Sequence, residues 1–222
     1  KLNNDYNVTF LPETQFVELN FKKINLKEYF SDYNISGYAN HLKNIDTTKF
    51  YIEKYLDNII FLTAGGELFF NNYEEIVREG KLKNIKTNLD LITEGLDLLI
   101  DGENIYISGV TIENECAYLV LYKAKISNLQ KLKFNNIFKS SECVTHIQSG
   151  RIVKLNNKNS LLLATAADIL IKKDETDDKP QDNNSIYGKI LEIDLESNNY
   201  KIFSKGHRNI LGLYNDENVI LS

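Results

Sequence analysis

Two short polar segments of the chain carry side chains that could take part in chemistry. In residues 145–152, His146 stands just before a Ser-Gly-Arg turn. Residues 206–209 read Gly-His-Arg-Asn (the GHRN segment), so that donors, a titratable ring and a flexible glycine follow one another. An imidazole titrates near neutrality and can serve as a general base. A guanidinium matches carboxylate and carbonyl oxygens and stacks on flat rings, although Arg208 taken alone would be an ordinary salt-bridged arginine.

Short strands are predicted on both sides of the GHRN segment. Before it, Ile190, Leu191 and Ile193 alternate with acidic residues, which is typical of a half-buried strand. A polar turn at 196–199 and a second strand at 200–203 follow. After it, residues 211–222 show the pattern strand, polar turn at 215–218, strand. The GHRN segment is therefore expected to lie on a β scaffold.

The rest of the chain from residue 50 predicts the same kind of structure. Residues 50–72 contain three short strands, with turns at Asp57-Asn58 and Gly65-Gly66. A helical turn is predicted at 73–79, a hairpin around 101–104 and a strand at 116–123. Antiparallel strands without a long amphipathic helix favour an all-β protein, and buried hairpins followed by an outer strand favour a propeller. Residues 1–49 are poorly defined by their pattern.

Composition sets further bounds on the function. A chain of 222 residues can form one domain with its own core. The net charge of -5 gives no nucleic-acid footprint, and no apolar run is long enough to span a membrane. The chain opens on Lys1 and the strand pattern continues to Ser222, which predicts a mature or truncated piece of a longer protein.

Two segments together resemble a known family. The sequence GKILEID at 188–194, followed by KGHRNILGL at 205–213, is similar to the glucose/sorbosone dehydrogenases, which are soluble quinoprotein sugar dehydrogenases built as six-bladed β-propellers. Residues 145–152, followed by a strand ending in TAAD at 165–168, match a second segment of that family. The resemblance covers 89–222, with 50–72 as a preceding blade. It implies a partial six-bladed β-propeller of antiparallel four-stranded blades, one domain over residues 1–222, incomplete on its C-terminal side.

The resemblance also implies a function. The full-length protein would oxidise a sugar or polyol alcohol with pyrroloquinoline quinone, a planar tricarboxylate that supplies the hydride acceptor no side chain can provide. His146 would be the general base, Arg208 and Asn209 would contact the quinone, and His207 would pack structurally. Because equivalent loops of neighbouring blades meet at one end of a propeller, His146, Arg208 and Asn209 are expected to open onto one cleft.

A third and shorter match at 93–98 adds Glu94 as a cofactor-binding residue. The calcium-binding segment of the family is expected beyond Ser222, so no metal ligand is assigned within the chain. The chain departs from the family pattern at Thr145, where an acidic residue is common, and at Ala167, where a glycine is usual. These departures leave open a non-catalytic extracytoplasmic propeller that binds a protein or carbohydrate, or an interaction propeller without a ligand.

Cys116 and Cys143 are the only cysteines, and their surroundings lack the spacing of a zinc site. They could be two buried free thiols. The resemblance points to a periplasmic or secreted protein, in which paired thiols are favoured. A bridge requires the two Cα atoms to lie within about 7 Å.

Overall fold

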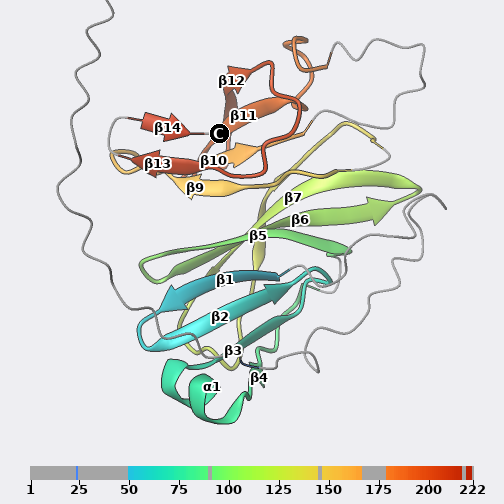
Figure 1. Ribbon diagram of the computed structural model, residues 1–222. Helices are drawn as coiled ribbons and strands as arrows, with labels where there is room; N and C mark the ends of the chain where they lie inside the picture. Colours follow the sequence, from blue (N-terminus) through green and yellow to red (C-terminus); the bar gives the residue numbers. More distant parts are fainter. Residues whose placement is uncertain are drawn as a thin grey trace, which may run out of the picture.

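The computed structural model describes residue 24 and residues 50–89, 92–144, 147–166, 179–216 and 219–221. These residues form three four-stranded antiparallel sheets and a two-stranded hairpin, which succeed one another along the chain (Figure 1). In each four-stranded sheet the strands are hydrogen-bonded in chain order. The expected antiparallel β architecture is confirmed for this part of the chain.

The first sheet consists of β1 (Phe50–Tyr55), β2 (Asn58–Thr63), β3 (Leu68–Asn72) and β4 (Lys83–Asn84). The turn between β1 and β2 is at Leu56 and Asp57, one residue earlier than predicted, because Asn58 already pairs with both Tyr55 and Asn72. Leu56 adopts a φ of 52°, a conformation that only glycine takes without strain. The position of this turn therefore contradicts the local residue preference.

The predicted helical turn is the helix α1 (Tyr73–Glu79), inserted between β3 and β4. The side chain of Asn72 accepts a hydrogen bond from the backbone N–H of Glu74, and Gly80 ends the helix at a φ of 66° with its N–H bonded to the carbonyl of Ile76. Ile76 is the buried residue of the helix and packs on the face of the first sheet. In the described part of the chain, no helix has the length and hydropathy needed to cross a membrane.

The second sheet contains two long strands. It consists of β5 (Glu94–Asp101), β6 (Asn104–Glu113), β7 (Cys116–Lys125) and β8 (Asn135–Lys139). The third sheet consists of β9 (Ile152–Lys154), β10 (Ser160–Ala164), β11 (Lys189–Asp194) and β12 (Tyr200–Lys205). The hairpin of β13 (Tyr214–Asp216) and β14 (Val219–Leu221) follows.

The first strands of successive sheets lie next to one another, with β1 against β5, β5 against β9, and β9 against β13. This is the arrangement of propeller blades around an axis, where the first strand of each blade is innermost. The described residues show three blades and a hairpin in the position of a fourth. Six blades and a closed ring are not part of what the structure shows.

The cores lie between the sheets. Leu161 and Leu163 of β10 point toward the second sheet, whereas Leu162 and Ala164 point toward the hairpin side. Both faces of β10 are therefore covered, which explains why all five of its residues are buried. Each buried leucine contributes about 1.5–3 kcal/mol relative to an exposed one. A further core between the first two sheets includes Ile60, Leu62 and Ile107.

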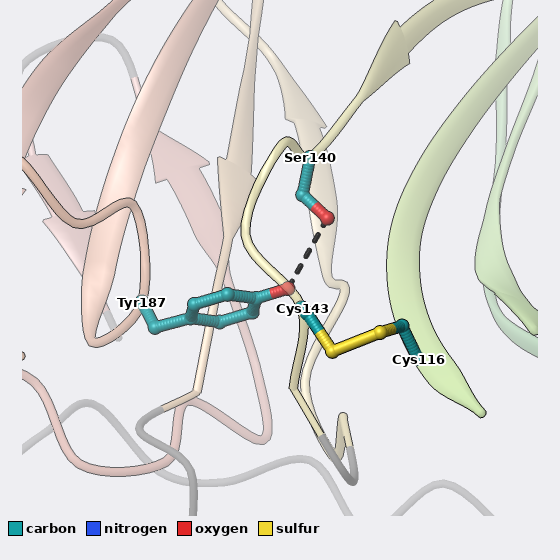
Figure 2. Close-up of a disulfide and its surroundings, with 4 residues drawn as sticks. All are labelled: Cys116, Ser140, Cys143 and Tyr187. Atoms are coloured by element: carbon teal, nitrogen blue, oxygen red, sulfur yellow. Dashed lines mark hydrogen bonds between the residues drawn. A yellow bond between two sulfur atoms is a disulfide. The ribbon is translucent and has the colours of Figure 1, made fainter. Parts of the chain in front are cut away.

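Cys116 and Cys143 form a disulfide, with their Cα atoms 4.9 Å apart (Figure 2). The bridge joins the start of β7 to the segment that leaves β8, and the backbone N–H of Ala117 donates to the carbonyl of Val144 beside it, at 2.8 Å. The alternative of two free thiols is therefore wrong. The same figure shows the hydroxyl of the buried Tyr187 3.2 Å from the hydroxyl of Ser140, which connects the third sheet to this region.

Candidate functional site

Four connections between strands gather at one end of the molecule: the turn between β2 and β3, and the segments that lead into β5, β9 and β13. We call this the entry end, formed by residues 64–67, 92–95, 147–151 and 206–213. The N–H of Gly95 donates to the carbonyl of Ala64 at 2.8 Å, which joins the first two connections. The hydroxyl of Ser149 donates to the carbonyl of Ile210 at 2.6 Å, which joins the last two. The GHRN segment and residues 147–151 of the other segment singled out for chemistry therefore lie at this end.

The GHRN segment is anchored at its first two residues. Gly206 has a φ of 91° and its N–H donates to the carbonyl of Pro180 at 2.9 Å. The N–H of His207 donates to the carbonyl of Gly188 at 3.0 Å, and its Nε2 lies 2.9 Å from the hydroxyl of Ser204. Burial lowers the pKa of His207. These contacts agree with the structural role expected for His207.

Arg208 and Asn209 are exposed at the entry end. The side-chain amide of Asn209 donates to Gln148 Oε1 at 3.4 Å, across a sequence separation of 61 residues. The fold thus brings the two predicted segments into contact at Gln148 and Asn209. His146 and Thr145 lie outside the described residues, so the shared cleft of His146, Arg208 and Asn209 stays a prediction.

A second polar cluster, which we call the axial cluster, consists of Tyr51 of β1, Asp97 of β5 and Arg151, which directly precedes β9. The guanidinium of Arg151 is 3.3 Å from Asp97 Oδ1, and its Nε–H donates to the carbonyl of Leu211 at 2.8 Å. Its central carbon is 4.8 Å from the centre of the Tyr51 ring. Arg151 therefore connects the start of the third sheet with the first sheet, the second sheet and the segment before the hairpin.

Burial governs the electrostatics of this axial cluster. Burial raises the pKa of Asp97, although the N–H of Ile152, which donates to Oδ2 at 2.8 Å, and Arg151 both act in the opposite direction. Burial also raises the pKa of Tyr51, which Arg151 lowers and the charges of Asp97 and Glu94 raise further. The cluster is held together by a guanidinium that contacts both a carboxylate and an aromatic ring.

Glu94 is the first residue of β5 and is only 6% exposed. It lies where the backbones of the first two sheets approach closely, since a Cβ on the neighbouring Gly95 would be 2.8 Å from the carbonyl oxygen of Thr63. The structure thus places Glu94 in the interior with Tyr51, whereas Arg208 and Asn209 are on the surface.

The sequence reasoning missed the roles of Tyr51, Asp97 and Arg151. Arg151 was included only as part of a turn, and Asp97 only as part of a short match. The available signal was the position of all three near the beginnings of predicted strands that are otherwise mostly apolar. Within the described ranges, no three His, Cys, Asp or Glu side chains come together in a way that could hold a metal ion.

Comparisons with known proteins bear on the fold. No protein-family model matches the chain, and no curated protein matches it by sequence. The solved structure of the PQQ-bound form of aldose sugar dehydrogenase from Streptomyces coelicolor is similar with a TM-score of 0.55 and 14% identity. The match covers 73% of this chain and 52% of that one.

A second solved structure, S. cerevisiae Dbp5 bound to Nup159 and Gle1, gives a TM-score of only 0.29 at 6% identity, over 72% of this chain and 40% of that one, and carries no weight. The chain spans about half the length of the Streptomyces coelicolor dehydrogenase. At 14% identity that likeness establishes a shared β-propeller-like architecture.

Proposed function

We propose that this chain forms part of a quinoprotein sugar dehydrogenase of the glucose/sorbosone dehydrogenase type. The longer protein would oxidise a hydroxyl group of a sugar or polyol outside the cytoplasm. In this proposal His146 is the general base, and Arg208 and Asn209 hold pyrroloquinoline quinone. The calcium ion of such enzymes belongs to the proposal for the longer protein, since the described residues offer no cluster for it.

One observation carries the proposal. The fold resembles that of a PQQ-bound aldose sugar dehydrogenase, and within this fold Asn209 of the GHRN segment contacts Gln148, two residues after His146. Two segments that are 61 residues apart were singled out from the sequence for one site, and their described parts meet. An unrelated pair of surface loops would have no reason to do so.

The described side chains fit a planar, anionic cofactor. Arg208 and Asn209 are exposed donors, and among the described residues Arg208 has no ion-pair partner. The backbone that carries them is fixed on one side by His207 and on the other by the bond from Ser149 to Ile210. A guanidinium and an amide held in this way can bind carboxylate and carbonyl oxygens. Glu94, whose side chain is only 6% exposed, is the third cofactor-binding residue of this proposal.

The chemistry divides between the cofactor and the chain. Pyrroloquinoline quinone, when bound, accepts the hydride from the carbon that bears the reacting hydroxyl. The proton of that hydroxyl moves to the imidazole of His146, for which a pKa near neutrality is suitable. Arg208 and Asn209 orient the cofactor relative to this base. The axial cluster around Arg151 holds the connection between them in place.

The test uses the longer protein, loaded with pyrroloquinoline quinone and calcium, and follows dye reduction with a panel of aldoses and polyols. His146→Ala should lower kcat by about 10²–10⁴-fold, the contribution of a general base. Arg208→Ala should weaken quinone binding measured by equilibrium dialysis. Arg78→Ala is the matched control, since Arg78 is an exposed arginine on α1. Unchanged activity of His146→Ala would show that this histidine is not the base.

The alternative is a propeller that binds a protein or carbohydrate without catalysis, which the departures from the family pattern at Thr145 and Ala167 leave open. The same protein would then fold normally, retain no quinone after dialysis and oxidise none of the sugars. Retained quinone together with sugar-dependent dye reduction would exclude this alternative.

A further inference from the structure

A hollow of about 620 Å³ lies at the opposite end of the first sheet from the entry end. It is found where β1 ends and β2 begins, at the paired residues Tyr55 and Asn58, whereas the entry end adjoins the other end of this pair, at Phe50 and Thr63. The lining side chains come from the β1–β2 turn region and from the start of α1: Lys54, Asp57, Ile59, Asn72, Tyr73 and Glu74. A volume of this size is suitable for a small ligand.

Tyr73 provides an aromatic surface in the lining. Its side chain is the first of α1 and is 61% exposed, which leaves much of the ring in contact with water. Its backbone is nevertheless fixed, because its N–H donates to the carbonyl of Asp57 at 3.0 Å. The ring thus stands on a well-anchored backbone next to the β1–β2 turn. Exposed aromatic rings with a polar tip are common at binding surfaces because one part is apolar and the other is wet.

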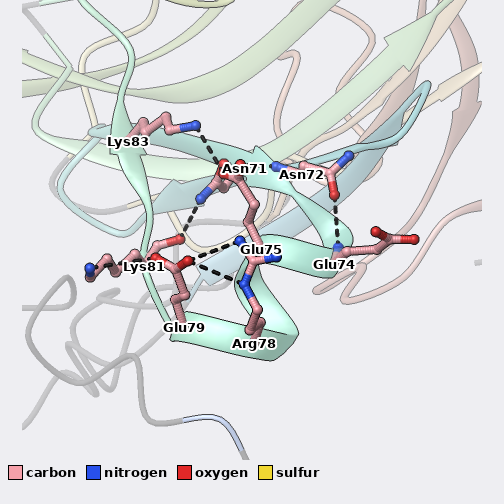
Figure 3. Close-up of polar contacts among 8 residues, drawn as sticks. All are labelled: Asn71, Asn72, Glu74, Glu75, Arg78, Glu79, Lys81 and Lys83. Carbon is pink, nitrogen blue, oxygen red and sulfur yellow. Dashed lines mark hydrogen bonds and ion pairs between the residues drawn. The ribbon is translucent and has the colours of Figure 1, made fainter.

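Most charged side chains around α1 form ion pairs with one another. Glu75 pairs with Lys83 at 3.0 Å, and Glu79 pairs with Arg78 at 2.9 Å and with Lys81 at 3.5 Å (Figure 3).

In contrast, Lys54, Asp57 and Glu74 form no ion pair within the part of the chain that the structure describes. The backbone of Glu74 is held by the Asn72 side chain at 2.9 Å, which leaves the Glu74 carboxylate outside this capping bond. The described lining residues therefore offer one ammonium and two carboxylates to a ligand.

These groups define the chemical class of the ligand. Among the described lining residues, one positive and two negative side chains leave a net charge of −1, which disfavours an anion, and these charged groups also disfavour contact with the hydrocarbon of a lipid. An aromatic face with donors and acceptors beside it suits a neutral, polyhydroxylated molecule whose ring presents C–H groups on one side and hydroxyls at its edge. We propose that this hollow is a binding site for a neutral oligosaccharide, with one sugar ring against Tyr73.

In this site Asp57 and Glu74 accept hydrogen bonds from sugar hydroxyls and Lys54 donates one. The site is separate from the entry end, so it does not rest on the proposed oxidation. Sugar binding at this hollow and quinone-dependent oxidation at the entry end are measured in separate experiments. The two proposals can therefore fail independently.

The test measures the binding of maltotetraose, cellotetraose and mannotetraose to the 222-residue chain. Saturation-transfer NMR and calorimetry, both without quinone, detect and quantify this binding. At least one of the three should bind with a dissociation constant below about 10 mM. Tyr73→Ala should weaken that binding by about tenfold or more, and Tyr73→Phe, which keeps the ring, should retain it. Glu74→Gln should also weaken it, because a charged acceptor is lost.

Tyr214→Ala is the matched control, since Tyr214 is an equally exposed tyrosine at 59% but belongs to β13. It should bind the sugar as the unchanged chain does. Amide spectra of Tyr73→Ala must show an intact fold, and Tyr73→Phe provides the second variant if they do not. Absence of binding for all three sugars, or equal binding by Tyr73→Ala and the unchanged chain, would overturn the proposal.

Discussion

Replacing Arg151 by alanine should destabilise the protein more than any other single charge removal at the entry end. The variant loses the charged hydrogen bond from Nε to the carbonyl of Leu211, worth about 1.5–3 kcal/mol. It also loses the contact with the Tyr51 ring, worth about 0.5–1 kcal/mol. Asp97, whose side chain is 16% exposed, keeps only its backbone donors. The total is about 3 kcal/mol, or roughly 6–12 °C in Tm for a chain of this length.

The assay is thermal unfolding followed by circular dichroism, together with urea unfolding at neutral pH. Arg78→Ala is the control, because that arginine is exposed and pairs with its neighbour in sequence, and its Tm should be unchanged. Combining Arg151→Ala with Asp97→Ala should cost less than the sum of the single changes, since the two residues form one ion pair. If Arg151→Ala shifts Tm no more than Arg78→Ala, the axial cluster does not hold the sheets together.

Three further predictions concern stability. Replacing Cys116 and Cys143 by serine should cost about 3.5 kcal/mol in urea unfolding, from the 27-residue separation of the bridge, and reductant should then have no additional effect. Burial raises the pKa of the Asp97 carboxyl above its ordinary value of 3.8. Its contribution to the free energy of unfolding is therefore complete below pH 3.8 and is lost as pH rises through the folded-state pKa. A pH series of unfolding experiments should show this loss in the unchanged protein and not in Asp97→Asn. The pKa of His207 is lowered from 6.5, so stability should fall as pH drops below 6.5, and His207→Asn should remove that dependence in the same series.

A fourth prediction concerns the joint between the first two sheets. The Asn88 side chain donates to the carbonyl of Phe134 at 3.0 Å and accepts from its N–H at 2.7 Å. Asn88→Ala should lower the free energy of unfolding by about 1–3 kcal/mol, because two backbone groups lose their partners. Urea unfolding measures this change. An unchanged midpoint would show that water replaces the amide without cost.

Local patterns were sufficient to predict most of the strands. The alternation before the GHRN segment corresponds to β11, and the polar turn and second strand correspond to β12. The helical turn was predicted with the same bounds as α1, where Asn72 and Gly80 supply the capping residues. These elements depend on residues close together in sequence, so their signals are present in a single chain.

Contacts between sheets could not be predicted from local patterns. Tyr51, Asp97 and Arg151 are far apart in sequence, and their meeting depends on the angle at which successive sheets pack. The turn at Leu56 was placed one residue late because a non-glycine residue adopts a positive φ there, against its own preference. The disulfide was left open because pairing depends on the compartment as well as on distance.

The order of strands within each sheet has a consequence for how the chain folds. Each four-stranded sheet is made from one continuous segment, and its neighbouring strands are also neighbours in sequence. Contacts of low sequence separation form early, since little chain entropy is lost when short loops close. The three sheets can therefore gain structure separately, while the joints made by Asn88 and Arg151 form only on docking. Native-state hydrogen exchange should accordingly show that each sheet opens as a separate cooperative unit. The amides at these joints should have lower free energies of opening than the amides inside the sheets that they connect.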